Sequence, residues 1–331
     1  MTGGMKVTKL DNLISLIKNK HVYIQTHNYP DQDALASAFG LAALLKNRGI
    51  SSTICYSGQI DKYNTLKMVE LIPIPVRRGE ELIITAMDEI LLVDSQEGNI
   101  NVKKFPGKII ACIDHHPLQE TDSYHFFDIR SSMGSCASII GEYFMENDIE
   151  PEEQVATALT YGIKMDTGNL TRRVSERDVE VFSFLFRRAD EEKLQELDRS
   201  SLTKDDLNAY KEAITNLKIY GRLGIVKIGN DYSEAILASI SDFLLSLSEL
   251  DVTLVYAYRV GGLKFSIRSA TPLIDAGKAI KWALKGLGDG GGHAVMAAGF
   301  IPGLDTETSI LNMSSLVEQR LIQYVAKKII D

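Results

Sequence analysis

Four short segments of the sequence carry carboxylates and imidazoles at spacings that suit metal ions. They are His27-Asn28-Tyr29-Pro30-Asp31-Gln32-Asp33, Asp94-Ser95, Asp114-His115-His116 and Asp166-Thr167-Gly168. Each segment alone has an ordinary structural explanation, because an aspartate often begins a helix or forms a turn. Gathered in one place, the four carboxylates of Asp31, Asp33, Asp94 and Asp166 would repel one another or become protonated unless cations lay among them. The set therefore predicts a metal centre.

The mixture of residue types indicates which metal and which chemistry. Two divalent cations would offset the four carboxylates. Imidazole and carboxylate ligands together favour Mn²⁺, and they also accept Mg²⁺. Zinc is less favoured, because the sequence offers neither thiolate ligands nor a closed set of four. Two ions about 3.5–4 Å apart can activate water and stabilise an in-line displacement at phosphorus. We therefore predict two metal ions and hydrolysis of a phosphate ester.

Apolar runs place most of these segments at the ends of strands. Runs at 21–26, 51–57, 90–93 and 109–113 predict strands, and the pattern at 33–48 predicts a helix that Gly49 ends. Helices are also predicted at 135–146, 152–163 and 177–187. Such alternation predicts an α/β fold with a parallel sheet covered on both faces. Ligands of such sheets bind beyond the carboxyl ends of the strands, where three of the four segments fall.

The composition changes along the chain and predicts two domains. Residues 1–187 are expected to form the catalytic domain, 188–222 a polar helical connector, and 223–331 a smaller α/β domain with a mixed sheet. In this last part we predict strands at 223–228, 234–240, 252–260 and 263–268 and a final helix at 314–329. The active site is expected in the cleft between the two domains.

Composition also limits the partners of the protein. The 331 residues are 45% hydrophobic and 24% charged, as in soluble globular proteins. No apolar run reaches the roughly 18–20 residues that span a bilayer, so no membrane association is expected. The three cysteines and the start of the chain predict a cytoplasmic protein. A net charge of −8 argues against a long nucleic-acid track, so an anionic substrate should be short. Nothing in the sequence excludes a homodimer.

The four segments, in this order, resemble the four motifs of the DHH phosphoesterase superfamily. Further along, Phe265–Ser269, Gly290-Gly291-Gly292-His293 and Ala297–Phe300 look like the DHH-associated substrate-binding domain. The resemblance extends over nearly the whole chain. One departure is Gln32, which stands where many relatives have glycine between the two aspartates; it affects the expected substrate more than the expected ligands.

The resemblance implies a role for each site residue. It implies one Mn²⁺ held by His27, Asp31 and Asp94, and a second held by Asp33, Asp94, His115 and Asp166. Asp114 would orient its neighbour, and His116 would face the scissile phosphate.

The substrate-binding residues are expected in the second domain. Arg268 can hold a phosphate in a fork, and Gly290, Gly291 and Gly292 would expose backbone N–H groups in a phosphate-binding turn, with His293 as a further donor. Arg172 and Arg173 follow Asp166 closely, but paired arginines are more often solvated than bound to substrate.

The favoured function is a phosphodiesterase or phosphatase for short oligonucleotides or small nucleotides such as adenosine 3′,5′-bisphosphate. This corresponds to the branch of the superfamily that contains oligoribonuclease (nanoRNase) and the adenosine-bisphosphate phosphatases. The alternatives are a manganese inorganic pyrophosphatase or exopolyphosphatase and a phosphodiesterase for cyclic or linear dinucleotides. A nucleotide sensor without catalysis is less favoured, because all the expected ligands are retained.

Overall fold

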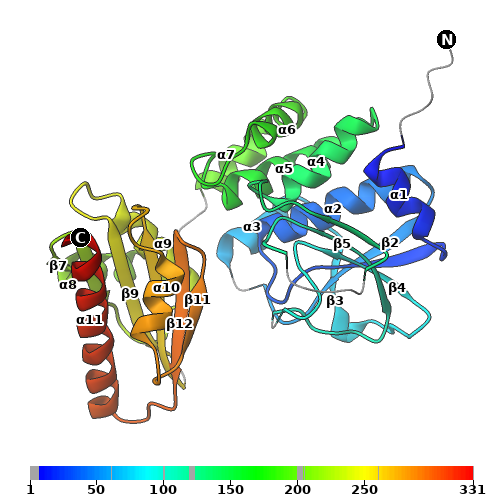
Figure 1. The fold of residues 1–331 in the computed structure, drawn as a ribbon. Coiled ribbons are helices and arrows are strands. Elements are labelled where there is room, and N and C mark those ends of the chain that lie inside the picture. The colour runs from blue at the N-terminus through cyan, green and yellow to red at the C-terminus, as the bar shows by residue number, and fades with distance from the viewer. Residues whose placement is uncertain are drawn as a thin grey trace. The chain divides into compact units, whose positions relative to one another are not determined.

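The computed structural model describes residues 7–60, 62–99, 101–118, 124–199, 204, 206–259 and 261–330. The chain divides into two compact units, residues 1–201 and residues 202–331, and each unit has its own six-stranded sheet (Figure 1). None of the helices in the described ranges combines the length and the apolar character that crossing a bilayer requires.

The first unit is built on a parallel sheet with the strand order β3-β2-β1-β4-β5-β6. The strands are β1 (His21–Gln25), β2 (Ser51–Tyr56), β3 (Val76–Arg78), β4 (Glu89–Val93), β5 (Lys108–Asp114) and β6 (Phe126–Ile129). The four predicted strands are confirmed, whereas β3 and β6 are additional short edge strands. The strand order reverses between β1 and β4, and ligands of doubly wound sheets bind at such a point.

Helices cover one face of this sheet and build the larger core. They are α1 (Lys9–Leu16), α2 (Gln32–Asn47), α3 (Tyr63–Leu71), α4 (Cys136–Glu146), α5 (Glu153–Asp166), α6 (Glu176–Phe186) and α7 (Glu191–Arg199), with a 3-10 turn η1 (Gly79–Glu81) after β3. Alternate strand residues such as Ile24, Leu91 and Ile113 belong to this core. Their neighbours Ile90 and Cys112 point to a smaller cluster on the opposite face.

The second unit contains a mixed sheet with the order β11-β12-β10-β9-β8-β7, in which β8 and β9 pair in parallel and the other neighbouring strands pair antiparallel. Helices α10 and α11 pack on one face, and α8 and α9 pack on the other. The elements are α8 (Asp206–Asn216), β7 (Lys218–Tyr220), β8 (Leu223–Lys227), α9 (Glu234–Leu245), β9 (Val252–Arg259), β10 (Gly262–Ser269), α10 (Ala276–Ala283), β11 (Asp289–Gly292), β12 (Met296–Pro302) and α11 (Glu307–Ile330).

The residues that the sequence assigned to a connector, 188–222, divide between the two units. They contribute α7 to the first unit and α8 and β7 to the second.

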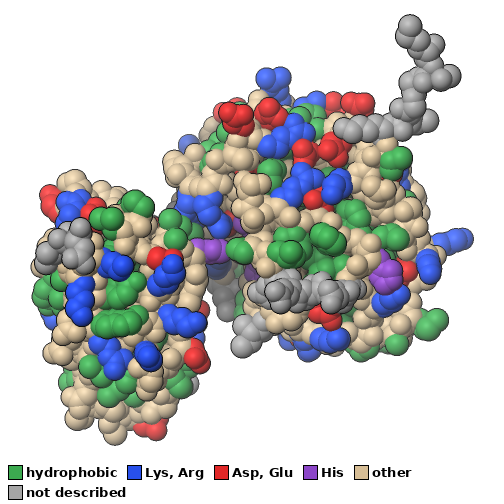
Figure 2. Space-filling view, viewed as in Figure 1, with side chains coloured by type: hydrophobic (Ala, Val, Ile, Leu, Met, Phe, Trp, Pro, Cys, Tyr) green, Lys and Arg blue, Asp and Glu red, His purple; other side chains and the backbone are tan. Residues whose placement is uncertain are grey.

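On the face of the first unit drawn in Figure 2, acidic and basic side chains lie side by side over the helices. The charge on that face is therefore mixed in sign.

The predicted strand at 234–240 is wrong, because these residues form the first part of helix α9. Ser233 begins the helix, and its side chain accepts a hydrogen bond from the backbone N–H of Ile236. The buried residues are Ile236, Leu237, Ile240, Ser241 and Leu244, a spacing of three and four that belongs to a helix. Over seven residues an apolar run does not distinguish the two structures.

This correction predicts different effects of two nearby substitutions. Leu237 and Ser239 would share a face of a strand, but in the helix Leu237 is buried and Ser239 is exposed. Leu237→Ala should lower the free energy of unfolding of the second unit by about 2–5 kcal/mol, and Ser239→Ala should change it by less than about 0.5 kcal/mol. Urea unfolding monitored by circular dichroism measures both, and equal losses would contradict the helix.

Candidate metal centre

The predicted ligands lie at the strand ends on either side of the point where the sheet order reverses. His27 follows β1, Asp94 follows β4, and His115 follows β5. Asp31 begins helix α2 and accepts the backbone N–H of Ala34 at 3.2 Å. Asp31 is therefore both a helix cap and part of the cluster.

Helices bring the remaining carboxylates to the same place. Asp33 lies in the first turn of α2, and Asp166 is the last residue of α5. The two helices approach closely at Gly162, where an added Cβ would lie 2.9 Å from the Cβ of Ala36 and 3.3 Å from the Cα of Asp33. A larger residue at position 162 would push the helices and their carboxylates apart.

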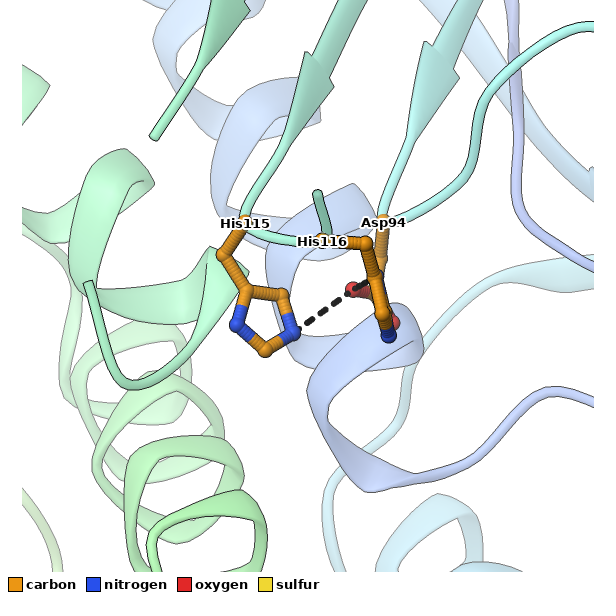
Figure 3. Close-up of side chains that lie close together, drawn as sticks. All are labelled: Asp94, His115 and His116. Atoms are coloured by element: carbon orange, nitrogen blue, oxygen red, sulfur yellow. Dashed lines mark ion pairs between the residues drawn. The ribbon is translucent and has the colours of Figure 1, made fainter. Parts of the chain in front are cut away.

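Asp94 occupies the centre of the cluster, with one oxygen toward each of two histidines. Its Oδ2 lies 3.6 Å from His27 Nε2. Its Oδ1 lies 3.5 Å from His115 Nε2, and Figure 3 shows these two residues. The side chain is 4% exposed, and Oδ1 has no hydrogen-bond partner among the described residues. Its backbone is left-handed, with φ of 56°, which is unusual for a residue other than glycine. A buried carboxylate that faces a histidine on each side, with no hydrogen-bond donor to Oδ1 among the described residues, fits a ligand shared by two cations.

The first group around Asp94 consists of His27, Asp31 and Asp94. His27 Nε2 lies 3.9 Å from Asp31 Oδ1. The other ring nitrogen, Nδ1, lies 2.8 Å from the carbonyl oxygen of Asn28, which can only accept, so Nδ1 carries the proton. Nε2 is therefore the ring nitrogen that faces the carboxylates and that can supply a lone pair to a metal ion.

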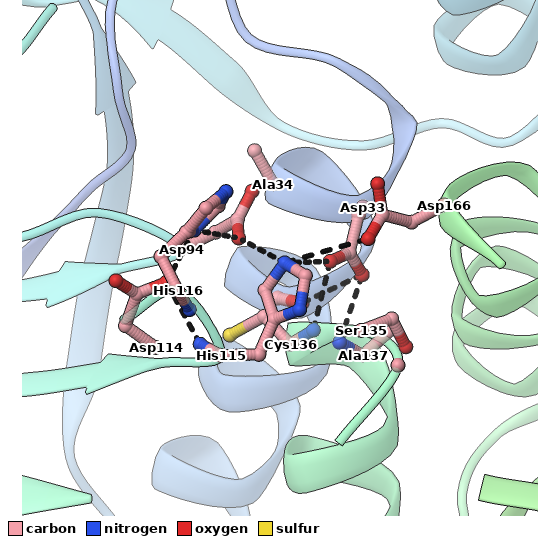
Figure 4. Close-up of polar contacts among 12 residues, drawn as sticks. Asp33, Ala34, Asp94, Asp114, His115, His116, Ser135, Cys136, Ala137 and Asp166 are labelled. Atoms are coloured by element: carbon pink, nitrogen blue, oxygen red, sulfur yellow. Dashed lines mark hydrogen bonds and ion pairs between the residues drawn. The ribbon is translucent and has the colours of Figure 1, made fainter. Parts of the chain in front are cut away.

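The second group consists of Asp33, His115 and Asp166. His115 Nε2 lies 3.8 Å from Asp33 Oδ2 and 3.4 Å from Asp166 Oδ2. Asp33 is held from behind, because Cys136 N–H donates to Oδ2 and Ala137 N–H donates to Oδ1, both at 2.8 Å (Figure 4). The first N–H groups of α4 thus orient this carboxylate toward the cluster, a contact that could not be predicted from local sequence patterns.

The protonation behaviour of the cluster agrees with a cation site. Burial, together with the neighbouring carboxylates, raises the pKa of Asp33 and of Asp94 well above the ordinary value. Burial also acts on Asp31, but His27 and Lys62 outweigh it and lower its pKa. Burial lowers the pKa of the His115 imidazole. Without cations, protons must neutralise the buried carboxylates, and divalent ions would replace those protons.

Asp114 orients His116 rather than the ring of His115. Its Oδ1 accepts from His116 Nδ1 at 2.9 Å and from the backbone N–H of His115 at 2.8 Å (Figure 4). His115 Nδ1 is buried without a hydrogen-bond partner among the described residues. The other oxygen of Asp114 accepts from Gln96 Nε2 at 2.6 Å. Gln96 is completely buried and was missed, because nothing in its sequence position indicates a partner 18 residues away.

His116 belongs to a third group of side chains that could hold a metal ion. Asp94, His115 and His116 also offer ligand atoms that lie close enough for one ion. However, Nδ1 of His116 is engaged with Asp114, and the side chain is 38% exposed, against 2% for His115. The more open ring is better placed to meet a substrate than to complete a buried ligand set.

In the second unit, the guanidinium of Arg268 donates hydrogen bonds to a carboxylate, a hydroxyl and a backbone carbonyl of the same unit. It lies on β10, and its Nε donates to Asp242 Oδ1 on α9 at 2.7 Å. Its Nη1 donates to Ser266 Oγ at 3.2 Å and to the carbonyl of Ile267 at 3.1 Å. Asp242 is 51% exposed, so this ion pair contributes little stability. A bound phosphate would compete with the carboxylate of Asp242 for the Nε–H group.

The predicted glycine turn is a strand, β11, at the edge of the second sheet. Gly292 pairs with Ala297, which pairs with Ile267 beside Arg268, so the hairpin and Arg268 lie at the same end of the sheet. Gly292 has φ of 146°, and a Cβ there would lie 2.6 Å from the Cα of Ala297. The turn itself follows at His293, whose N–H donates to the carbonyl of Met296 at 2.7 Å. Packing therefore accounts for Gly292, while the predicted contact of Gly290, Gly291, Gly292 and His293 with phosphate stays a prediction.

Metal binding should stabilise the first unit. At about 100 times its Kd, Mn²⁺ should add about 2.7 kcal/mol to the free energy of unfolding. The pKa values of Asp33 and Asp94 are raised in the folded protein. In the metal-free protein, their favourable contribution to the free energy of unfolding is therefore present at low pH and is lost as the pH rises through those raised values. At one fixed Mn²⁺ concentration, the gain should thus be larger at about pH 7 than at about pH 5. Thermal unfolding with Mn²⁺ or with EDTA measures this, and an equal or smaller gain at the higher pH would contradict it.

Comparison with known proteins agrees with this geometry. Residues 21–163 match the model of the DHH family, N-terminal domain. An uncharacterized protein of Methanocaldococcus jannaschii is 30% identical over 287 residues, which are 86% of this chain and 59% of the relative. A manganese-dependent inorganic pyrophosphatase of the same organism is 30% identical over 129 residues, 39% of each protein. The chain therefore spans less than two thirds of either relative.

Among solved structures, an exopolyphosphatase-related protein of Bacteroides fragilis has a similar fold. The TM-score is 0.77 at 17% identity, with 99% of both chains covered. At this identity the likeness establishes the fold alone.

Proposed function

We propose that the chain is a two-metal phosphoesterase of the DHH family, whose N-terminal domain model matches residues 21–163. The observation that carries the proposal is the position of Asp94, whose two oxygens face two separate His and Asp groups. A single-metal or purely structural site would not need a buried carboxylate open on both sides. Manganese is the proposed metal, with magnesium as the alternative, because the groups combine imidazoles with carboxylates.

The proposed ligand sets share Asp94. One set is His27, Asp31 and Asp94, and the other is Asp33, Asp94, His115 and Asp166. When bound, the metal pair supplies Lewis acidity for activating water and for stabilising charge at phosphorus. The protein holds the ligands in place through the Asn28 carbonyl behind His27 and the N–H groups of α4 behind Asp33.

His116 is the proposed contact to the scissile phosphate. Burial lowers its pKa, but the hydrogen bond and the charge of Asp114 outweigh burial and raise it. The hydrogen bond between Nδ1 and Asp114 fixes the orientation of the ring, and Nε2 is the nitrogen proposed to meet the substrate. It can donate to a phosphate oxygen in the protonated form.

The proposed substrates are short oligonucleotides or small nucleotides such as adenosine 3′,5′-bisphosphate. The net charge of −8 supports a short substrate held by a few cations, and Arg268 with the hairpin at His293 supplies candidate contacts to a phosphate. The proposed compartment is the cytoplasm, which the three buried free cysteines support.

A second candidate is hydrolysis of pyrophosphate or polyphosphate. It is favoured by the similarity to the manganese-dependent inorganic pyrophosphatase of Methanocaldococcus jannaschii, which matches 39% of the chain at 30% identity. The match covers 39% of each protein, and a substrate-binding region outside the matched residues can differ between the two proteins.

A substrate panel with purified protein and Mn²⁺ tests the proposal. The panel contains RNA and DNA of two to ten nucleotides, adenosine 3′,5′-bisphosphate, linear and cyclic dinucleotides, and pyrophosphate. Release of mononucleotides or of phosphate from the nucleotide substrates is the expected result. Rapid hydrolysis of pyrophosphate with inert nucleotides would establish the second candidate instead, and inactivity on every substrate would refute both.

A further inference from the structure

Arg173 places a guanidinium directly beside the second group of candidate ligands. Its Nη2 lies 3.3 Å from Asp166 Oδ2. The same oxygen lies 3.4 Å from His115 Nε2, so the arginine and the histidine meet at one carboxylate. The Arg173 side chain is 31% exposed and that of Asp166 is 24% exposed. A molecule arriving from solvent can therefore reach this edge of the cluster, unlike the buried Asp94.

The backbone that carries Arg173 is fixed by local contacts. The Thr167 hydroxyl donates to the carbonyl of Ile163 at 2.6 Å, and the Thr167 carbonyl accepts from the N–H of Arg172 at 2.8 Å. Arg173 has φ of 50°, a conformation that costs free energy in residues other than glycine. A Cβ added at Gly134 would lie 2.8 Å from the Arg173 carbonyl oxygen, so the turn packs tightly against the start of α4.

The neighbouring Arg172 contacts the same residue in a different way. Its Nη2 donates to the backbone carbonyl of Asp166 at 3.1 Å, a contact that holds the end of α5. Arg173 instead contacts the carboxylate, which is the group that a divalent ion would take. Metal binding would thus leave the Arg172 contact intact and would draw the carboxylate away from Arg173.

We propose that Arg173 binds a non-bridging oxygen of the substrate phosphate once Asp166 has turned to a metal ion. The proposal rests on the proposed function, because it assumes a phosphate at the metal pair. A guanidinium that loses its carboxylate needs another anion, and its planar donors match phosphate geometry. Arg173 then supplies positive charge beside the second ion, on the open side of the cluster.

The test compares metal and phosphate binding in Arg173→Gln, in Arg173→Lys and in a control variant. Arg187→Gln is the control, because it removes the same charge from an exposed residue just beyond the other end of α6, about 16 Å along the helix. Isothermal titration gives the Kd for Mn²⁺ and then, on the Mn²⁺-loaded protein, the Kd for inorganic phosphate. Circular dichroism and thermal unfolding confirm that each variant is folded.

Arg173→Gln is expected to bind Mn²⁺ as well as wild type or better, since a cation competing for Asp166 is gone. Its affinity for phosphate should fall about 10- to 100-fold, as for loss of a charge-assisted hydrogen bond. Arg173→Lys should retain part of that affinity, and Arg187→Gln all of it. Unchanged phosphate affinity in Arg173→Gln would overturn the proposal, as would a parallel loss of Mn²⁺ affinity and thermal stability, which a purely structural residue would show.

Phosphate binding is measured without turnover, which separates this proposal from the proposed function. A wild-type protein that binds Mn²⁺ and phosphate through Arg173 but hydrolyses no phosphoester would refute the function and support Arg173. A wild-type protein that binds no Mn²⁺ would overturn both.

Discussion

Replacement of Asp94 by asparagine is expected to lower phosphoester hydrolysis by about 10³-fold or more and to reduce the Mn²⁺ stoichiometry below two. Loss of one preorganised group at a reacting centre commonly costs 10²–10³-fold, and Asp94 contributes to both ligand sets. An amide keeps the size of the side chain but presents one oxygen instead of two and carries no charge. At least one of the two groups must therefore lose a ligand.

The fold should survive this substitution. Burial and nearby carboxylates already raise the pKa of Asp94, so the metal-free protein gains by losing this charge. Asp94→Asn should unfold at the same temperature as wild type in EDTA, or higher. Asp148→Asn is the matched control, because Asp148 is exposed and also has a left-handed backbone, with φ of 50°. An active Asp94→Asn protein that binds two Mn²⁺ would contradict the shared-ligand assignment.

Replacement of His116 by alanine is expected to lower kcat by about 10²- to 10³-fold while the Kd for Mn²⁺ changes little. General acid–base groups typically contribute 10²–10⁴-fold. His116 is bonded to Asp114 and is more exposed than His115, so we expect it to act on the substrate rather than on the metal.

His115→Ala gives the contrasting result, because His115 Nε2 is the imidazole nitrogen that faces Asp33, Asp94 and Asp166. It should lower the Mn²⁺ stoichiometry as well as the rate. Kinetics and isothermal titration on the two variants separate the roles of these adjacent histidines. A loss of Mn²⁺ binding in His116→Ala would instead assign His116 to the ligand set that it forms with Asp94 and His115.

The sequence was sufficient to predict that the candidate ligands cluster, because His27, Asp94 and His115 follow apolar strands. The runs that become β1, β4 and β5 are visible without a structure, and parallel strands bring their carboxyl ends to one edge. Asp166 was harder, since it ends a helix, and its place in the set came from the resemblance to the DHH superfamily.

The sequence was not sufficient for contacts between distant segments. The hydrogen bond from Gln96 to Asp114 and the N–H groups of α4 behind Asp33 depend on how strands and helices are packed. Local apolar patterns were also ambiguous. Residues 234–240 form a helix because four-residue spacing buries Ile236 and Ile240, and Gly290–Gly292 form a strand because β12 supplies a partner.

The most direct test of the shared role of Asp94 is diffraction from Mn²⁺-soaked crystals at the manganese absorption edge. Two anomalous peaks are expected on opposite sides of the Asp94 carboxylate, about 3.5–4 Å apart, one beside His27 and the other beside His115. A single peak at Asp94, or two peaks of which neither contacts it, would contradict the assignment.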